Sequence, residues 1–91
     1  MTERHVTVAS RLGLHARASA RLVHTANSFK SKITIRRIDN GRAVDAKSIF
    51  GVLMLAATRG TALIVSASGT DEVAATEVIS TLIEASDGGK G

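Results

Sequence analysis

The sequence Asp-Asn-Gly at Asp39–Gly41 constrains the fold more than any other feature, because it lies between two short segments with strand character. Before it, Ile33 and Ile35 alternate with polar residues, which is typical of a strand with one buried face. Asn-Gly favours the positive φ angles of a tight turn, so the chain is expected to reverse and return as a strand over 42–45. A hairpin at this place favours an antiparallel sheet.

Apolar spacing predicts two further strands and three helices. The strands are expected at about 4–9 and over 63–67, and the helices over 16–28, over 48–57 and along an apolar stripe of Ala74, Ala75, Val78, Ile79, Leu82 and Ile83. Ser48 is expected to cap the second helix and Gly60 to stop it. The order β-α-β-β-α-β-α, with hairpin connections, predicts an α+β fold with an antiparallel sheet and helices on one face.

Length and composition fit one small domain. The 91 residues are 44% hydrophobic and 22% charged, values typical of a globular protein. There is no cysteine, no secretory signal pattern and no apolar run near the ~18 residues of a membrane span. We therefore expect a cytoplasmic protein without membrane insertion, with a domain over 1–86 and a flexible tail over 87–91.

The charge is unevenly distributed along the chain. Residues 1–60 hold eleven Lys or Arg against three Asp or Glu, whereas residues 61–91 hold one against five. A basic segment of this kind points to an acidic partner, a phosphate or nucleic acid, or to a simple solvated surface. Nucleic acid is disfavoured, because Phe29 and Phe50 are the only aromatic residues on which bases could stack.

His15 stands where a helix is expected to begin, within the stretch Gly-Leu-His-Ala-Arg-Ala-Ser-Ala. Serine, threonine or aspartate would cap that position better. An imidazole can accept a transferable group, and the unpartnered N–H groups of a first helical turn attract anions. Arg17 would add a donor fork suited to phosphate oxygens. A phosphate-carrying histidine and an ordinary loop histidine both fit this position.

His5 and His24 show no ligand spacing, and no metal site is expected.

Ser48 is a hydroxyl at the start of the second predicted helix, beside Lys47 and the apolar residues Ile49, Phe50 and Leu53. A phosphate there would add roughly −1.5 to −2 charges at neutral pH. If the apolar residues were partly exposed, they would form a contact surface for a partner. The alternative is a plain N-cap followed by core residues.

Gly-Leu-His-Ala-Arg around His15, followed some thirty residues later by Lys-Ser-Ile-Phe-Gly-Val-Leu-Met-Leu, resembles the HPr family. These are the histidine-containing phosphocarriers of the phosphoenolpyruvate-dependent phosphotransferase system. The resemblance covers nearly the whole chain, and Ser66–Gly69 also fits the family pattern. It implies an open-faced β-sandwich of four antiparallel strands and three helices.

The resemblance also implies roles for individual residues. His15 would carry phosphate on Nδ1, Arg17 would assist it, and Ser48 would be phosphorylated by HPr kinase/phosphorylase. Enzyme I, enzyme IIA-type acceptors and the kinase would dock where the chain has Ile49, Phe50 and Leu53. The basic residues Arg21 and Lys47 are expected near the two helix starts, facing acidic surfaces of these partners. The chain would then be a carrier rather than an enzyme, without a cofactor, and we expect a monomer because a relay meets its partners in turn.

One position departs from the commonest pattern of the family, which has proline directly after the arginine. Here that residue is Ala18, and the chain contains no proline. Alanine keeps helix propensity and gives up the fixed φ of proline. The pattern His-Ala-Arg-Ala-Ser-Ala is similar to that of some proteobacterial members, a number of which serve nitrogen-related relays. The transfer chemistry is therefore expected, and a mainly regulatory module in nitrogen or carbon signalling, acting through Ser48, is the alternative.

Overall fold

The computed structural model describes residues 1–85, and the predicted domain end at 86 and tail over 87–91 lie outside these residues. The elements follow the predicted order: β1 (Thr2–Thr7), α1 (Ala16–Ala26), β2 (Lys32–Arg37), β3 (Ala43–Asp45), α2 (Ile49–Met54), β4 (Ala62–Ser68) and α3 (Glu72–Glu84). β1 begins two residues earlier than expected because Thr2 and Glu3 already pair with Ala67 and Ser66 of β4.

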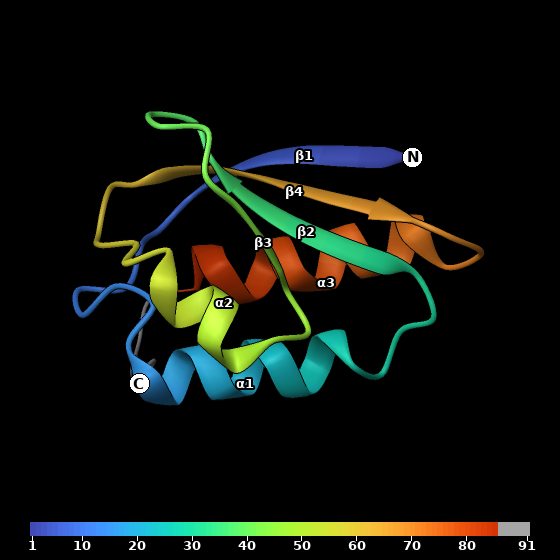
Figure 1. Ribbon diagram of the computed structural model, residues 1–91, viewed down its shortest axis with the longest axis horizontal. Coiled ribbons are helices and arrows are strands. Elements are labelled where there is room, and N and C mark those ends of the chain that lie inside the picture. The colour runs from blue at the N-terminus through green and yellow to red at the C-terminus, as the bar shows by residue number, and fades with distance from the viewer. Residues whose placement is uncertain (86–91) are drawn as a thin grey trace.

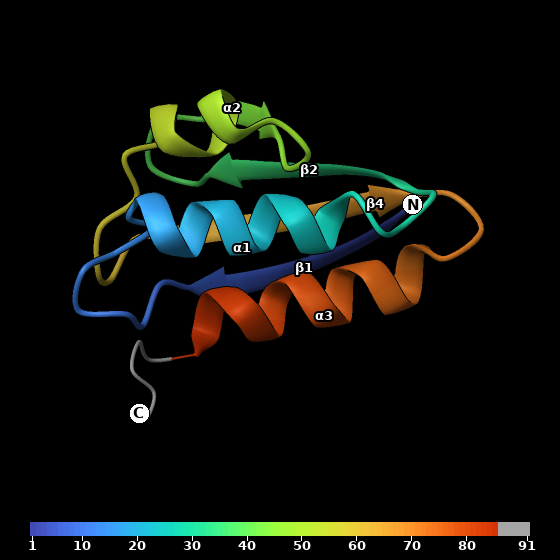
Figure 2. The ribbon, with the colours of Figure 1, turned by 90° about the horizontal axis from the view of Figure 1, so that it is seen from below.

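The four strands form one antiparallel sheet in the order β1-β4-β2-β3. Figure 1 shows the three helices on the same side of this sheet, with its other face uncovered. Seen from below in Figure 2, α1 lies between α2 and α3, and all three run in front of the strands. The α+β class, the open-faced sandwich and the placement of the helices are therefore confirmed.

The Asp39–Gly41 turn joins β2 to β3 as predicted. Gly41 has a φ of +74°, and its N–H donates to the carbonyl of Arg37 at 3.0 Å. The Arg37 guanidinium donates to both carboxylate oxygens of Asp39, at 2.9 and 2.7 Å. This bidentate ion pair lowers the pKa of Asp39 from its ordinary value and holds the tip of the hairpin against the end of β2.

The core lies between the sheet and the helices, and α3 meets it with a face that differs from the predicted stripe. Its buried residues are Ala75, Thr76, Ile79, Ser80 and Ile83, whereas Ala74 and Val78 are exposed. A polar residue can face the core here because the hydroxyl of Thr76 donates to the carbonyls of Glu72 and Val73, both at 3.0 Å. The predicted stripe is therefore correct for Ala75, Ile79, Leu82 and Ile83 and wrong for Ala74 and Val78.

α2 ends at Met54, so the prediction that it runs to Ala57 and is stopped by Gly60 is wrong. Ala56 has a φ of +50°, the left-handed conformation that terminates helices. The Arg37 guanidinium donates to the carbonyls of Leu55 at 2.7 Å and Ala56 at 3.3 Å, which satisfies acceptors at the helix end. Two of the apolar residues after Met54, Leu55 and Ala57, are buried core residues of the loop that follows α2.

Asp71 connects the start of α3 to the turn between α1 and β2. Its carboxylate accepts the backbone N–H groups of Lys30 and Ser31, each at 2.9 Å, and the Ser31 hydroxyl at 2.5 Å. The serine hydroxyl and these N–H groups lower the pKa of Asp71 to about 2.

Acid should therefore weaken the hydrogen bonds of Asp71 to Lys30 and Ser31 over a defined pH range. The folded-state pKa of about 2 lies below the ordinary value of 3.8, so the unfolded chain binds more protons between these limits. The stability that Asp71 contributes is present above about pH 4 and is lost as the pH falls toward 2. In urea titrations over pH 2–6, Asp71→Asn should be less stable than the parent at pH 6, and the gap should close at pH 2. A constant gap would contradict the assignment.

Candidate functional site

His15 is the N-cap of α1 and acts through its side chain. Its backbone is extended, with φ −68° and ψ 175°, and its Nδ1 accepts the N–H of Ala18 at 3.3 Å. Its carbonyl accepts the N–H of Ser19 at 2.8 Å, the first hydrogen bond of the helix. The imidazole thus takes the capping role that serine or aspartate usually takes, which the sequence argument did not foresee.

The loop before His15 is fixed against the loop that follows α2. The N–H of Leu14 donates to the carbonyl of Ala57 at 2.9 Å, and the buried hydroxyl of Ser19 donates to the Leu14 carbonyl at 2.8 Å. Gly13 has a φ of +68°, and a Cβ there would lie 2.5 Å from the Ala57 carbonyl oxygen. Neither position was predicted from the sequence, although a glycine two residues before the histidine is a signal for such a close approach.

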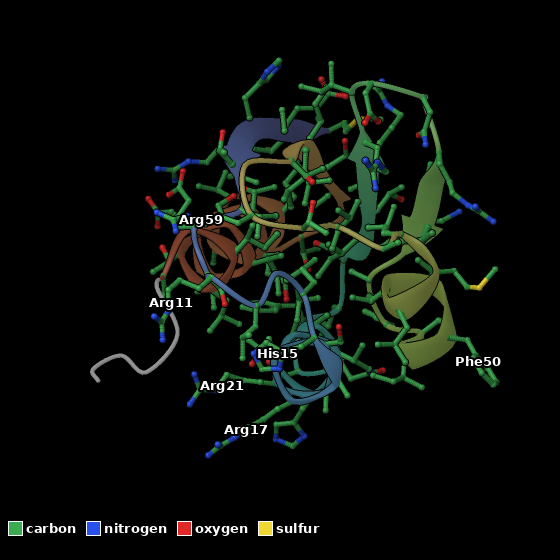
Figure 3. The ribbon with its side chains drawn as sticks, turned by 90° about the vertical axis from the view of Figure 1, so that its left-hand side faces the viewer. Arg11, His15, Arg17, Arg21, Phe50 and Arg59 are labelled. Atoms are coloured by element: carbon green, nitrogen blue, oxygen red, sulfur yellow. The ribbon has the colours of Figure 1, made fainter. Side chains whose placement is uncertain are left out.

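Arginines lie to one side of His15. Figure 3 shows the side chains of Arg11, Arg17, Arg21 and Arg59 on that side, and Phe50 of α2 on the opposite side. Arg17 and Arg21 are exposed on successive turns of α1. Within residues 1–85 neither side chain makes a hydrogen bond or ion pair. Arg17 directs its guanidinium away from His15, toward solvent. Arg17 and Arg21 were predicted from the sequence as site residues, whereas Arg59, which comes to the same side from the loop after α2, was not.

Ser48 caps α2 as predicted, and its hydroxyl oxygen accepts the N–H of Gly51 at 3.2 Å. The structure does not bring it to His15, because α1 and α2 run in opposite directions (Figures 1 and 2). The start of α2 lies at the end of α1, where the Asn27 amide donates to the Lys47 carbonyl at 3.3 Å. The Lys47 ammonium itself donates to the carbonyl of Phe29 at 2.8 Å.

One face of α2 is apolar and exposed. We call it the α2 patch, and its members are Ile49, Phe50, Leu53 and Met54. Phe50 is 78% exposed and Met54 56%, so these side chains lie outside the core, and the alternative interpretation of the apolar residues after Ser48 as core residues is wrong. Met54 was not among the predicted docking residues. Exposed apolar side chains that lie together are typical of a protein interaction surface.

A shallow hollow lies between β1 and α3, where it is lined by Arg4, Glu77, Val78, Thr81 and Leu82. Across residues 1–85 there is no group of three or more His, Asp or Glu side chains placed to hold a metal ion. In the same part of the chain no helix has the length and hydropathy needed to cross a membrane.

Comparisons with known proteins agree with this geometry. Residues 2–85 match the family described as PTS-HPr, the PTS HPr component phosphorylation site. The chain belongs to the HPr family. It is 48% identical over 84 residues to the phosphocarrier protein HPr of Xylella fastidiosa, with 92% of each chain covered. It is 47% identical over 83 residues to that of Cupriavidus necator, with 91% of each covered.

Solved HPr structures share the fold. HPr-C-His from Thermoanaerobacter tengcongensis superposes with a TM-score of 0.87 at 36% identity, covering 93% of each chain. An HPr dimer from the same organism gives a TM-score of 0.71 at 37% identity, covering 92% of this chain and 94% of the other. Membership makes the chain a phosphocarrier of the phosphotransferase system, and phosphohistidine chemistry in sugar transport follows from the family.

Proposed function

We propose that the chain accepts a phosphoryl group from enzyme I on Nδ1 of His15 and passes it to an enzyme IIA-type acceptor. The observation that carries this proposal is the position of His15 at the start of α1, with Nδ1 directed at the first helical turn. A phosphoryl group there would meet the N–H groups and positive dipole end of an 11-residue helix. His5 and His24 have no such surroundings.

The arginines beside His15 support the same chemistry. Arg17 stands two residues after His15 on an exposed turn, so its guanidinium is free to swing toward phosphoryl oxygens when they arrive. Arg21 extends the positive charge by one turn. An acidic partner surface would be attracted over about 8–10 Å at physiological salt, and docking should weaken as salt increases.

The α2 patch would supply the apolar part of the docking surface. Phe50 is the most exposed of its members, and aromatic side chains are frequent anchors of protein interfaces. Lys47 is less free to contact a partner than its sequence position indicates, because its ammonium already donates to the Phe29 carbonyl. We therefore propose that partner proteins bind to the α2 patch and to Arg17 and Arg21. The phosphoryl group on His15 would then lie at the interface between the two proteins.

Incubation with enzyme I and phosphoenolpyruvate tests the proposal. The chain should gain one acid-labile phosphoryl group, and peptide mapping under alkaline conditions should place it on His15. Phosphate found on His5 or His24 would remove the assignment. Phosphoryl transfer to the enzyme IIA-type acceptor without any phosphorylated form of this chain would also contradict the assignment.

Regulation through Ser48 is a second proposed role, supported by its capping geometry. A phosphate on Ser48 would keep an oxygen available for the N–H of Gly51 and would add negative charge next to Ile49 and Phe50. The α2 helix would persist, while an acidic partner docking on the α2 patch would be repelled. Because Ser48 lies far from the start of α1, inhibition would act on docking and not on the His15 nitrogen.

HPr kinase/phosphorylase with ATP should add one acid-stable phosphate to the parent and none to Ser48→Ala. The phosphoserine form should accept phosphate from enzyme I roughly tenfold more slowly at low salt, because like charges then oppose docking. The deficit should shrink as salt is raised, since screening removes the repulsion. A deficit independent of salt would argue for a structural effect on α2 instead.

The remaining assignments are part of the same proposal. The chain would work as a non-enzymatic, cytoplasmic carrier, and as a monomer, although a relative from Thermoanaerobacter tengcongensis is described as a dimer. Sedimentation at micromolar concentration distinguishes the two states. A role mainly in nitrogen or carbon signalling remains the alternative to sugar uptake, and it would show as binding to a regulator that depends on Ser48 but not on His15.

A further inference from the structure

The hydrogen bond between His15 and Ala18 defines the resting state of the imidazole. Nδ1 accepts the backbone N–H of Ala18 at 3.3 Å, and an accepting ring nitrogen carries no proton. The proton of neutral His15 therefore lies on Nε2. The proposed function requires the lone pair of Nδ1 for phosphoryl transfer. In the resting state this lone pair accepts the Ala18 N–H, a donor that proline at position 18 would lack.

Phosphoryl transfer removes the acceptor of this bond. The Nδ1 lone pair forms the new N–P bond, the bond between phosphorus and the donor breaks with its electron pair going to the donor, and the Nε2 proton stays on the ring. The Ala18 N–H then has no partner on the imidazole. Within the helix it has none either, because the first intrahelical bond is that from Ser19 to His15.

We propose that the Ala18 N–H passes from Nδ1 to a phosphoryl oxygen and thereby holds the phosphoryl group more firmly than a chain with proline at this position. This inference rests on the proposed function of His15. A bond to a charged oxygen is roughly twice as strong as one between neutral groups, so the exchange favours the phosphorylated form. The neighbouring bond from the Ser19 hydroxyl to the Leu14 carbonyl, 2.8 Å, keeps the cap in position during the exchange.

Proline is the direct test, because it removes the N–H and fixes φ at a value that a first helical turn already has. At the third residue of α1 its ring fits a first helical turn, where no intrahelical bond is lost. Ala18→Gly is the matched control, since it also changes the side chain but keeps the N–H. Circular dichroism should show that both variants retain the fold.

The parent and each variant are mixed in equal amounts with catalytic enzyme I and limiting phosphoenolpyruvate until the phosphoryl group has equilibrated. Intact masses then give the phosphorylated to unphosphorylated ratio of each chain. The ratio should be about fivefold lower for Ala18→Pro than for the parent, equivalent to about 1 kcal/mol. For Ala18→Gly it should stay within about twofold of the parent.

Equal ratios for the parent and Ala18→Pro would overturn the inference and leave the proposed function intact. Equal losses in Ala18→Pro and Ala18→Gly would overturn it too, because the side chain and not the N–H would then be responsible. Failure of the proposed function has a different signature. In that case His15→Ala would still be phosphorylated in the same mixture.

Discussion

Replacement of His15 by alanine should abolish phosphoryl acceptance from enzyme I. We expect the rate of acceptance to fall at least about 10³-fold, as is typical when a nucleophile is removed. The reason is that Nδ1 of His15 is the imidazole nitrogen placed at the start of α1. His5→Ala and His24→Ala are matched controls, because both side chains are exposed and neither caps a helix. Acid-labile phosphate measured by intact mass should persist in both controls.

The same substitution should also cost stability, because it removes the cap of α1. Loss of a capping side chain costs about 1 kcal/mol, to be read from urea denaturation. His15→Asn separates the two effects, since its amide oxygen can accept the Ala18 N–H but asparagine cannot carry phosphate. We expect near-parent stability with no acceptance. Acceptance by His15→Asn would contradict the assignment of His15.

Gly13→Ala should destabilise the chain by about 3 kcal/mol or more. The positive φ of +68° costs an alanine about 1–2 kcal/mol, and the clash of its Cβ with backbone atoms adds about 1–3 kcal/mol. That Cβ would lie 2.5 Å from the Ala57 carbonyl oxygen and 2.9 Å from the Cα of Thr58. The loop must move away, and His15 moves with it, so the rate of acceptance should fall about 10²-fold in the molecules that remain folded.

Gly41→Ala is the control for backbone conformation alone. Gly41 has a similar φ of +74°, but a Cβ there would meet no atom within 4 Å. Its cost should be about 1–2 kcal/mol, with no change in the rate of acceptance. Equal losses of stability in the two variants would show that the close contact between the loops is not the reason why position 13 requires glycine.

Much of the fold followed from local pattern. The Asp39–Gly41 turn, the alternation of Ile33 and Ile35 and the helical spacing after His15 predicted the element order and the hairpin correctly. Each of these signals depends only on residues close together in the chain. The errors arose where distant segments decided the outcome. Arg37 satisfies the carbonyls at the end of α2, and this helix stops at Met54, before the predicted end at Ala57.

Some features of the candidate site were likewise predictable from the sequence, and others depend on the tertiary structure. The sequence alone determined that His15 and Ser48 begin helices, because capping and helical spacing are local properties. Only the tertiary structure decided that these two helix starts lie apart, because α1 and α2 pack in opposite directions. It also placed the loop at Ala57 against Gly13, a contact across more than forty residues that no local pattern encodes. The position of His15 depends on that contact, because the loop before His15 is held by the hydrogen bond from the Leu14 N–H to the Ala57 carbonyl and not by a sheet ladder.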